Sequence, residues 1–141
     1  MESTVASPAN LPLGALRRIR VLLIEDDPEH AALTCAHIRD HDDSPFHIEW
    51  ESNMLNAISR LSKPGIDVVL LDLGMEDLSG YKTHLAITSV AKHTPVVIYT
   101  ADDSAISHDL TMGAFRYLVK GRTHPVELRQ ALHEAALSAP L

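Results

Sequence analysis

The 141-residue chain contains a single cysteine, few aromatic residues and no long apolar run. Cys35 cannot form an internal disulfide, which favours a reducing, cytoplasmic compartment. No stretch approaches the roughly 18 consecutive apolar residues that a membrane-spanning helix needs. Residues 1–4 show neither the basic nor the apolar segment of a secretory signal. These absences argue against a secreted, disulfide-stabilised protein and against a membrane protein.

Positive charge is also scarce. The chain has 12 Lys and Arg against 19 Asp and Glu, which gives a formal net charge of −7. A surface of that sign repels phosphates, so we expect no direct binding to nucleic acid or to an anionic membrane. The 45% of hydrophobic residues and 22% of charged residues are ordinary for a globular protein, and 141 residues is the length of one domain.

Short apolar runs alternate with helical patterns along most of the chain. Four runs are too short for helices and rich in Val, Ile and Leu, which is typical of strands buried on both faces. They cover residues 21–24, 68–71, 96–99 and 117–119. Residues 46–51 alternate apolar and polar side chains, which predicts a half-exposed strand at a sheet edge. We interpret residues 1–18 as an N-terminal extension, either flexible or packed on the domain, 19–138 as the domain and 139–141 as a tail.

Helical patterns separate these runs. Asp27 followed by Pro28 predicts an N-cap and a first-turn proline for a helix that ends near Arg39. Ser52 can cap a second helix, which would bury one apolar face formed by Leu55, Ile58 and Leu61. A third helix is expected after Gly80.

Two more helices complete the pattern. One is expected over residues 104–112, before Gly113, and one from Pro125. The apolar face of the last helix comprises Leu128, Ala131, Leu132 and Ala135. Five strand–helix units in this order predict an α/β fold, a flavodoxin-like, doubly wound, five-stranded parallel sheet of strand order 2-1-3-4-5 with five helices. In such sheets, ligands bind outside the carboxyl ends of the central strands.

Polar side chains stand at the carboxyl ends of four of the predicted strands. Glu25 and Asp26 follow the first strand and Asp72 the third, while Thr100 ends the fourth and Lys120 follows the fifth. Carboxylates brought together at one sheet edge repel each other unless a cation or a lysine neutralises them. Carboxylate oxygens without clustered Cys or His favour a hard divalent ion, so the sequence predicts a Mg²⁺ site there. The nine histidines show no metal-ligand spacing.

Four segments carry a family resemblance, namely residues 24–28 (IEDDP), 70–80 (LLDLGMEDLSG), 99–101 (YTA) and 113–121 (GAFRYLVKG). Together they resemble the receiver domain of two-component response regulators, over residues 19–137. The resemblance implies a phosphorylation-dependent signalling switch of the cytoplasm, which takes a phosphoryl group from a histidine kinase or a phosphorelay. It implies no enzyme in the usual sense, since such a domain catalyses only its own Mg²⁺-dependent phosphorylation and dephosphorylation.

The resemblance also implies a role for each matching residue of the metal and phosphorylation site. Asp72 would be the phosphoacceptor and a ligand of Mg²⁺, for which Mn²⁺ is an alternative. Asp26 would bind the ion directly, Glu25 would bind it through a water molecule, and the backbone carbonyl of Gly74 would complete the protein ligands.

Further implied roles concern the signal. Thr100 would hydrogen-bond a phosphoryl oxygen and Lys120 would form an ion pair with it, while Tyr117 would be the aromatic switch that turns inward with Thr100. The face built from the fourth helix, fifth strand and fifth helix would pass the change to an effector protein or output domain. The upstream partner would be a histidine kinase or a histidine phosphotransfer protein. If phosphorylation causes homodimerisation, this same face is the expected interface.

Three positions depart from the family pattern. Glu76 stands where proline is common, which predicts a more acidic loop beside Asp72. Arg116 stands where an acidic residue is common and adds positive charge to the fifth strand, and Gly121 follows the lysine where proline is frequent. No site position departs, so we expect a domain that can be phosphorylated.

Alternatives from other classes fit the residues less well. A nucleotide- or flavin-binding module needs a phosphate-cradling loop after the first strand, where this chain has Glu25 and Asp26. A phosphatase of the haloacid-dehalogenase type needs a second aspartate two residues after the nucleophile, where this chain has Gly74. A third alternative concerns context, in which the chain is the receiver portion of a longer hybrid kinase or cyclic-dinucleotide signalling protein.

Overall fold

The computed structural model describes residues 18–75, 81–101 and 113–138. Its elements in chain order are β1 (Ile19–Ile24), α2 (Pro28–Arg39), β2 (Phe46–Glu51), α3 (Met54–Leu61), β3 (Val68–Leu71), α4 (Tyr81–Val90), β4 (Val96–Thr100), β5 (Arg116–Val119) and α5 (Pro125–Ser138). The five strands form one sheet of order β2-β1-β3-β4-β5, and each neighbouring pair is parallel. The predicted fold and strand order are thereby confirmed.

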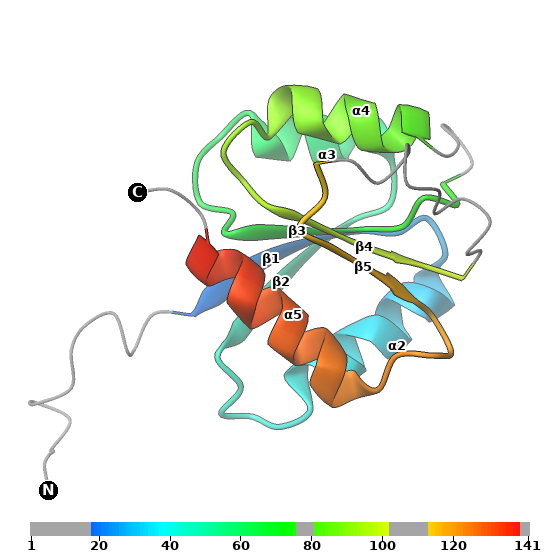
Figure 1. Ribbon diagram of the computed structural model, residues 1–141, viewed down its shortest axis with the longest axis vertical. Helices are drawn as coiled ribbons and strands as arrows, with labels where there is room; N and C mark the ends of the chain where they lie inside the picture. Colours follow the sequence, from blue (N-terminus) through cyan, green and yellow to red (C-terminus); the bar gives the residue numbers. More distant parts are fainter. Residues whose placement is uncertain (1–17, 76–80, 102–112, 139–141) are drawn as a thin grey trace, which may run out of the picture.

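Helices cover both faces of the sheet, with α2 and α5 on one side and α3 and α4 on the other (Figure 1). The predicted helix over residues 104–112, the loop residue Glu76, the tail and all but Arg18 of the predicted extension lie outside the described residues. Within the part of the chain that is described, no helix is long and apolar enough to cross a membrane.

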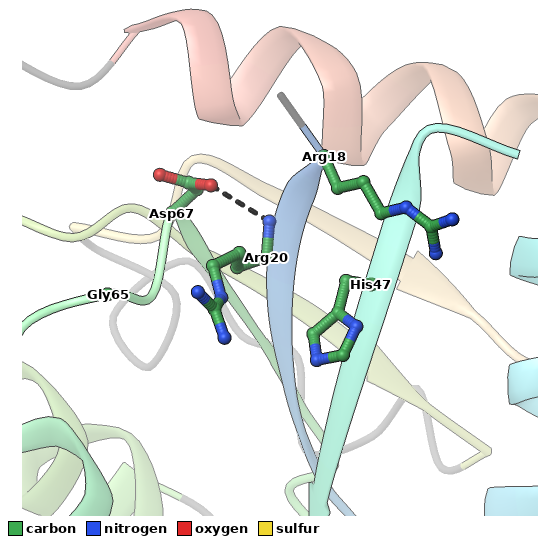
Figure 2. A pocket seen from close by; sticks show the side chains of 5 residues that line it. All are labelled: Arg18, Arg20, His47, Gly65 and Asp67. Carbon is green, nitrogen blue, oxygen red and sulfur yellow. Dashed lines mark hydrogen bonds between the residues drawn. The ribbon is translucent and has the colours of Figure 1, made fainter. Parts of the chain in front are cut away.

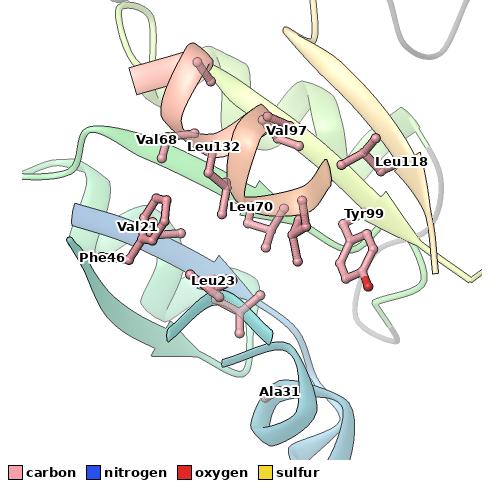
Figure 3. Packing of buried hydrophobic residues seen from close by; sticks show 14 residues of the cluster. Val21, Leu23, Ala31, Phe46, Val68, Leu70, Val97, Tyr99, Leu118 and Leu132 are labelled. Carbon is pink, nitrogen blue, oxygen red and sulfur yellow. The ribbon is translucent and has the colours of Figure 1, made fainter. Parts of the chain in front are cut away.

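Alternation along the central strands divides the core into two clusters. Val21 and Leu23 of β1 pack with α2 and α5, whereas Leu22 and Ile24 pack with α3 and α4, as the two-residue period of a strand requires. Figure 3 shows central-strand side chains of the first cluster packed against Leu132 of α5. All four α5 residues expected to be buried are fully buried. A sheet whose central strands are buried on both faces therefore supports the loops at its carboxyl edge.

Local differences from expectation concern the second helix and the last strand. The N-cap of α3 is Asn53, not Ser52, and its side chain accepts a hydrogen bond from the Asn56 N–H. The helix begins at Met54, and the residues that it buries against the sheet are Met54 and Ala57, which are three positions apart and share one face. Leu55 lies off this face and is 77% exposed. The expectation that β5 is buried on both faces was also wrong, because β5 is an edge strand and buries only Leu118.

Candidate functional site

Three carboxylates meet at the carboxyl edge of the sheet. Because β1 and β3 are neighbours, with Ile24 opposite Leu71, the residues that follow both strands lie side by side. The Asp72 N–H donates to the Ile24 carbonyl at 3.1 Å and continues the strand pairing by one residue. Carboxylate oxygens of Glu25, Asp26 and Asp72 lie within 4.8 Å of one another. The structure thus brings together the three acidic side chains that the sequence predicted.

Lys120 joins this group from the far side of β4. Its backbone N–H donates to the Thr100 carbonyl at 2.9 Å, which aligns the end of β5 with the end of β4. Its side chain runs past the Tyr99 ring, with Nζ 5.7 Å from the ring centroid. Nζ donates to Glu25 Oε1 and lies 3.4 Å from Asp72 Oδ2. The partly buried Lys120 ammonium is therefore shared by two buried carboxylates, those of Glu25 and Asp72.

The charge of the site is unbalanced without a further cation. Burial raises the pKa of Glu25 above its ordinary value, and nearby Asp72 raises it further, although the hydrogen bond from Lys120 opposes both effects. Three carboxylates face one ammonium group, and all the side-chain donors available to an ion here are oxygens. This donor chemistry fits a hard divalent ion such as Mg²⁺. Among the described residues, no other group of His, Cys, Asp and Glu is so arranged.

The Asp72 carboxylate is oriented from two sides. Oδ1 accepts a hydrogen bond from the Gly74 N–H at 3.0 Å, and Oδ2 faces Lys120 Nζ. A methyl group added at Gly74 would lie 3.4 Å from Oδ1, so glycine leaves the carboxylate accessible there. Asp72 is largely buried, with an exposed fraction of 8%.

Thr100 and Tyr117 occupy neighbouring strands. Thr100 is buried at the carboxyl end of β4, next in the sheet to the strand that precedes Asp72. Tyr117 on β5 pairs with Ile98 and is 51% exposed. Its ring is thus accessible on the outer strand rather than part of the core. The switch role implied for this pair stays a prediction.

Asp27 and Pro28 behave as predicted at the start of α2. The Asp27 side chain accepts hydrogen bonds from the backbone N–H groups of His30, at 3.2 Å, and Glu29, at 2.9 Å. These bonds, that of His30 first, lower the pKa of Asp27. Asp27 is therefore a helix cap, and its own backbone N–H donates to Glu25 Oε2 at 3.3 Å.

Sequence reasoning missed Trp50, which also contacts the site. Its indole Nε1–H donates to the backbone carbonyl of Glu25 at 2.7 Å. The alternation of residues 46–51 predicts that Trp50 lies on an edge strand. It does not predict the hydrogen-bond partner of the indole, which is 25 residues away in the chain.

Two departures from the family pattern now have structural consequences. Arg116 pairs with Glu127 at 3.4 Å and Glu134 at 3.7 Å on α5, so much of the positive charge expected on this face is offset locally. Gly121 has φ +84°, a left-handed conformation that proline cannot adopt. Proline, which is frequent at this position in the family, could therefore not replace Gly121 without a change in the backbone of the β5–α5 loop.

A separate pocket of about 390 Å³ lies at the opposite, amino-terminal edge of the sheet. Figure 2 shows the Arg18 and Arg20 guanidinium groups pointing away from each other, with His47 between them. The Arg20 guanidinium lies 3.5 Å from Glu49, and its backbone N–H donates to Asp67 at 2.8 Å. These guanidinium groups do not converge on a common point, and Arg20 already has Glu49 and Asp67 as partners.

Comparison with known proteins matches this geometry. The family model of the response regulator receiver domain matches residues 21–133. The chain belongs to the receiver family. Swarming motility regulation protein RssB of Serratia marcescens is 30% identical over 104 residues, which are 72% of this chain and 46% of RssB. The chain thus spans less than half the length of that relative.

Solved receiver structures share the fold. The receiver domain of sensor histidine kinase PA1611 from Pseudomonas aeruginosa, solved with Mg²⁺ in its active-site cleft, matches with a TM-score of 0.71 at 22% identity, over 86% of this chain and 99% of that one. Response regulator TrrA of Thermotoga maritima, solved in complex with histidine kinase ThkA, matches with a TM-score of 0.70 at 24% identity, over 84% and 98% of the two chains. At these identities the likeness concerns the fold alone.

Proposed function

We propose that this receiver domain is a phosphorylation-dependent switch that takes a phosphoryl group onto Asp72 with Mg²⁺ bound. The observation that carries the proposal is the cluster in which Asp72, Glu25 and Asp26 place carboxylate oxygens within 4.8 Å of one another, with Lys120 Nζ 3.4 Å from Asp72. Asp72 is 8% exposed, and Gly74, two residues further along the chain, places no side chain against its Oδ1.

Each residue of the site has a distinct part in the phosphoryl transfer. An Asp72 oxygen attacks phosphorus, so a bond between that oxygen and phosphorus forms while the bond from phosphorus to the donor's leaving group breaks. Lys120 already faces Oδ2 and would pair with the arriving phosphoryl oxygens. Asp26, Asp72, the Gly74 carbonyl and, through a water, Glu25 would hold Mg²⁺ or Mn²⁺. The bound ion supplies positive charge that offsets the repulsion between the carboxylate and the phosphoryl group.

Thr100 and Tyr117 would convert the new charge into a change of surface. A phosphoryl group adds about −1.5 to −2 charges and three acceptor oxygens. The Thr100 hydroxyl would move to one of these oxygens, and the exposed Tyr117 ring would turn into the space that it leaves. The altered β5–α5 face would then bind an effector, an output domain or a second copy of the chain. Hydrolysis of the acyl phosphate would reset the switch.

The upstream partner in this proposal is a histidine kinase or a histidine phosphotransfer protein in the cytoplasm, and nucleic acid is not a direct ligand. The complex of TrrA with histidine kinase ThkA supports a partner of this class. As an alternative, the chain is the receiver portion of a longer hybrid kinase or cyclic-dinucleotide signalling protein.

Intact-mass spectrometry after incubation with acetyl phosphate tests the proposal. We expect one phosphoryl adduct that requires Mg²⁺, disappears with a chelator and is absent from Asp72→Asn. The matched control is Asp43→Asn, which changes an exposed aspartate outside the cluster and should leave the adduct intact. An adduct of equal yield on folded Asp72→Asn would overturn the assignment.

A further inference from the structure

We propose that Trp50 is a positioning residue for the metal site, acting through the peptide group that joins Glu25 to Asp26. This inference rests on the proposed function, because the site it serves is the Mg²⁺ site described above. Trp50 touches neither the phosphoacceptor nor Lys120 through any hydrogen bond of the described residues. Its effect is on the backbone from which the acidic pair projects.

The hydrogen bonds around Glu25 carry the inference. Its backbone N–H donates to the Glu51 carbonyl at 3.1 Å, and its backbone carbonyl accepts from Trp50 Nε1 at 2.7 Å. Both backbone polar groups of Glu25 are thus held by β2, one by main chain and one by a side chain. The first bond continues the regular pairing of β1 with β2, but the second has no equivalent in a strand ladder.

This second bond fixes the direction in which Asp26 leaves the sheet. A peptide group is planar, so an indole that holds the Glu25 carbonyl also fixes the orientation of the Asp26 N–H and the position of its Cα. Asp26 follows the last β1 residue by two positions and lies beyond the strand pairing. The carbonyl bond to Trp50 is therefore a restraint on the carboxylate expected to bind Mg²⁺ directly.

Packing alone does not explain a tryptophan at this place. Trp50 is 42% exposed on an edge strand, and it is not a member of either core cluster. Indole is a donor with no acceptor atom, and its reach lets a residue opposite Leu23 contact the carbonyl of Glu25, two residues further along the chain. Phenylalanine at this position would keep most of the ring and lose the donor.

The same geometry makes Trp50 a reporter of the site. It is the only tryptophan of the chain, so emission excited at the long-wavelength edge of indole absorption arises from this ring alone. Because Nε1 is hydrogen-bonded to the peptide group next to Asp26, an ion bound by the Asp26 carboxylate would change the environment of the indole. We expect Trp50 emission to change on Mg²⁺ binding and to saturate with it.

Mg²⁺ titrations followed by amide chemical shifts test the inference on wild type and Trp50→Phe. A neutral hydrogen bond of ordinary net strength corresponds to about a three- to tenfold change in an equilibrium constant, so we expect Trp50→Phe to weaken Mg²⁺ binding by about that factor. The matched control is Leu55→Ala, which removes a more exposed apolar side chain from α3 and should leave the affinity unchanged. Thermal unfolding of each variant separates lost affinity from lost stability.

The outcomes separate the inference from the proposed function. An unchanged Mg²⁺ affinity in folded Trp50→Phe, with wild type that binds Mg²⁺ and is phosphorylated, would overturn the role of Trp50 and leave the proposed function standing. Wild type that neither binds Mg²⁺ nor takes a phosphoryl group would overturn both the role of Trp50 and the proposed function. If Trp50→Phe does not fold, the Mg²⁺ titration of wild type tests the role of Trp50. Trp50 emission that stays constant while the amide chemical shifts saturate would contradict a coupling between the indole and the metal site.

Discussion

Replacing Lys120 by methionine removes the cation that holds the site together while keeping the apolar stem of the side chain. In the folded protein, Glu25 is 1% and Asp72 8% exposed, and the Lys120 ammonium contacts both carboxylates. Breaking a buried ion pair by removing one partner destabilises a protein by about 3–5 kcal/mol. We expect Lys120→Met to lower the free energy of unfolding by about 3 kcal/mol at pH 8 in the absence of Mg²⁺.

Protonation of a carboxyl limits this loss at lower pH. Burial and Asp72 raise the pKa of Glu25, and loss of the Lys120 hydrogen bond raises it further. A carboxyl whose pKa is higher in the folded than in the unfolded protein favours folding below its unfolded pKa and loses that effect as the pH rises through its folded pKa. Protonating a carboxyl with an ordinary pKa of about 4.3 at pH 6 costs about 2 kcal/mol. The variant can therefore lose no more than about this amount of stability at pH 6, because Glu25 can take up a proton instead of staying charged. The effect of the substitution should therefore be larger at pH 8 than at pH 6.

Urea unfolding of wild type and Lys120→Met at both pH values, followed by circular dichroism, measures the effect. The control is Lys92→Met, which removes the same charge from an exposed loop and should change stability by no more than about 0.5 kcal/mol. Equal losses at pH 6 and pH 8, or no loss at either, would refute the reasoning that Lys120 is the counter-ion shared by buried Glu25 and Asp72.

Three further predictions concern the same protein. Mg²⁺ at ten times its Kd should raise the free energy of unfolding by about 1.4 kcal/mol, and Asp26→Asn should abolish the gain in a thermal shift assay. Arg60 donates to Glu49 at 2.6 Å and lowers its pKa, an effect that stabilises the fold above the unfolded pKa of about 4.3 and is lost as the pH falls through the folded pKa. Arg60→Met should thus lower stability by about 1.5 kcal/mol at pH 7 and by less at pH 3 in urea unfolding. Gly74→Ala should slow phosphorylation several-fold, because its methyl group would lie 3.4 Å from Asp72 Oδ1 and cover one side of the carboxylate, with a melting temperature close to that of wild type. An unchanged rate would show that this side of the carboxylate is not the one that reacts.

Much of the fold could be predicted from the sequence because the apolar pattern of the three central strands matches their burial. Residues 46–51 alternate and form the edge strand β2, while Val68–Leu71 is uniformly apolar and fully buried in β3. The second helix shows where pattern alone fails. Leu55 was expected in the core, but the position of the cap at Asn53 sets which side of α3 faces the sheet, and Ser52 and Asn53 are both good cap residues.

The site could be predicted in composition but not in its contacts. Parallel strands place their carboxyl ends at one edge, so the meeting of Glu25, Asp26 and Asp72 follows from strand order alone. The Lys120 contact to Glu25 spans 95 residues and depends on the course of a long side chain past Tyr99. The Trp50 contact depends on which carbonyl lies within reach at the end of an edge strand. The conformations of such side chains depend on tertiary packing, which cannot be predicted from a local sequence pattern.

Chemical location of the phosphoryl group tests the central claim most directly. An aspartyl phosphate is an acyl phosphate, which borohydride reduces to the alcohol, so the phosphorylated residue becomes homoserine and can be found by tandem mass spectrometry of peptides. After treatment with acetyl phosphate and Mg²⁺, we expect homoserine at position 72 and at no other aspartate. Homoserine at Asp26 or elsewhere, with residue 72 unchanged in a protein that carries the adduct, would contradict the account.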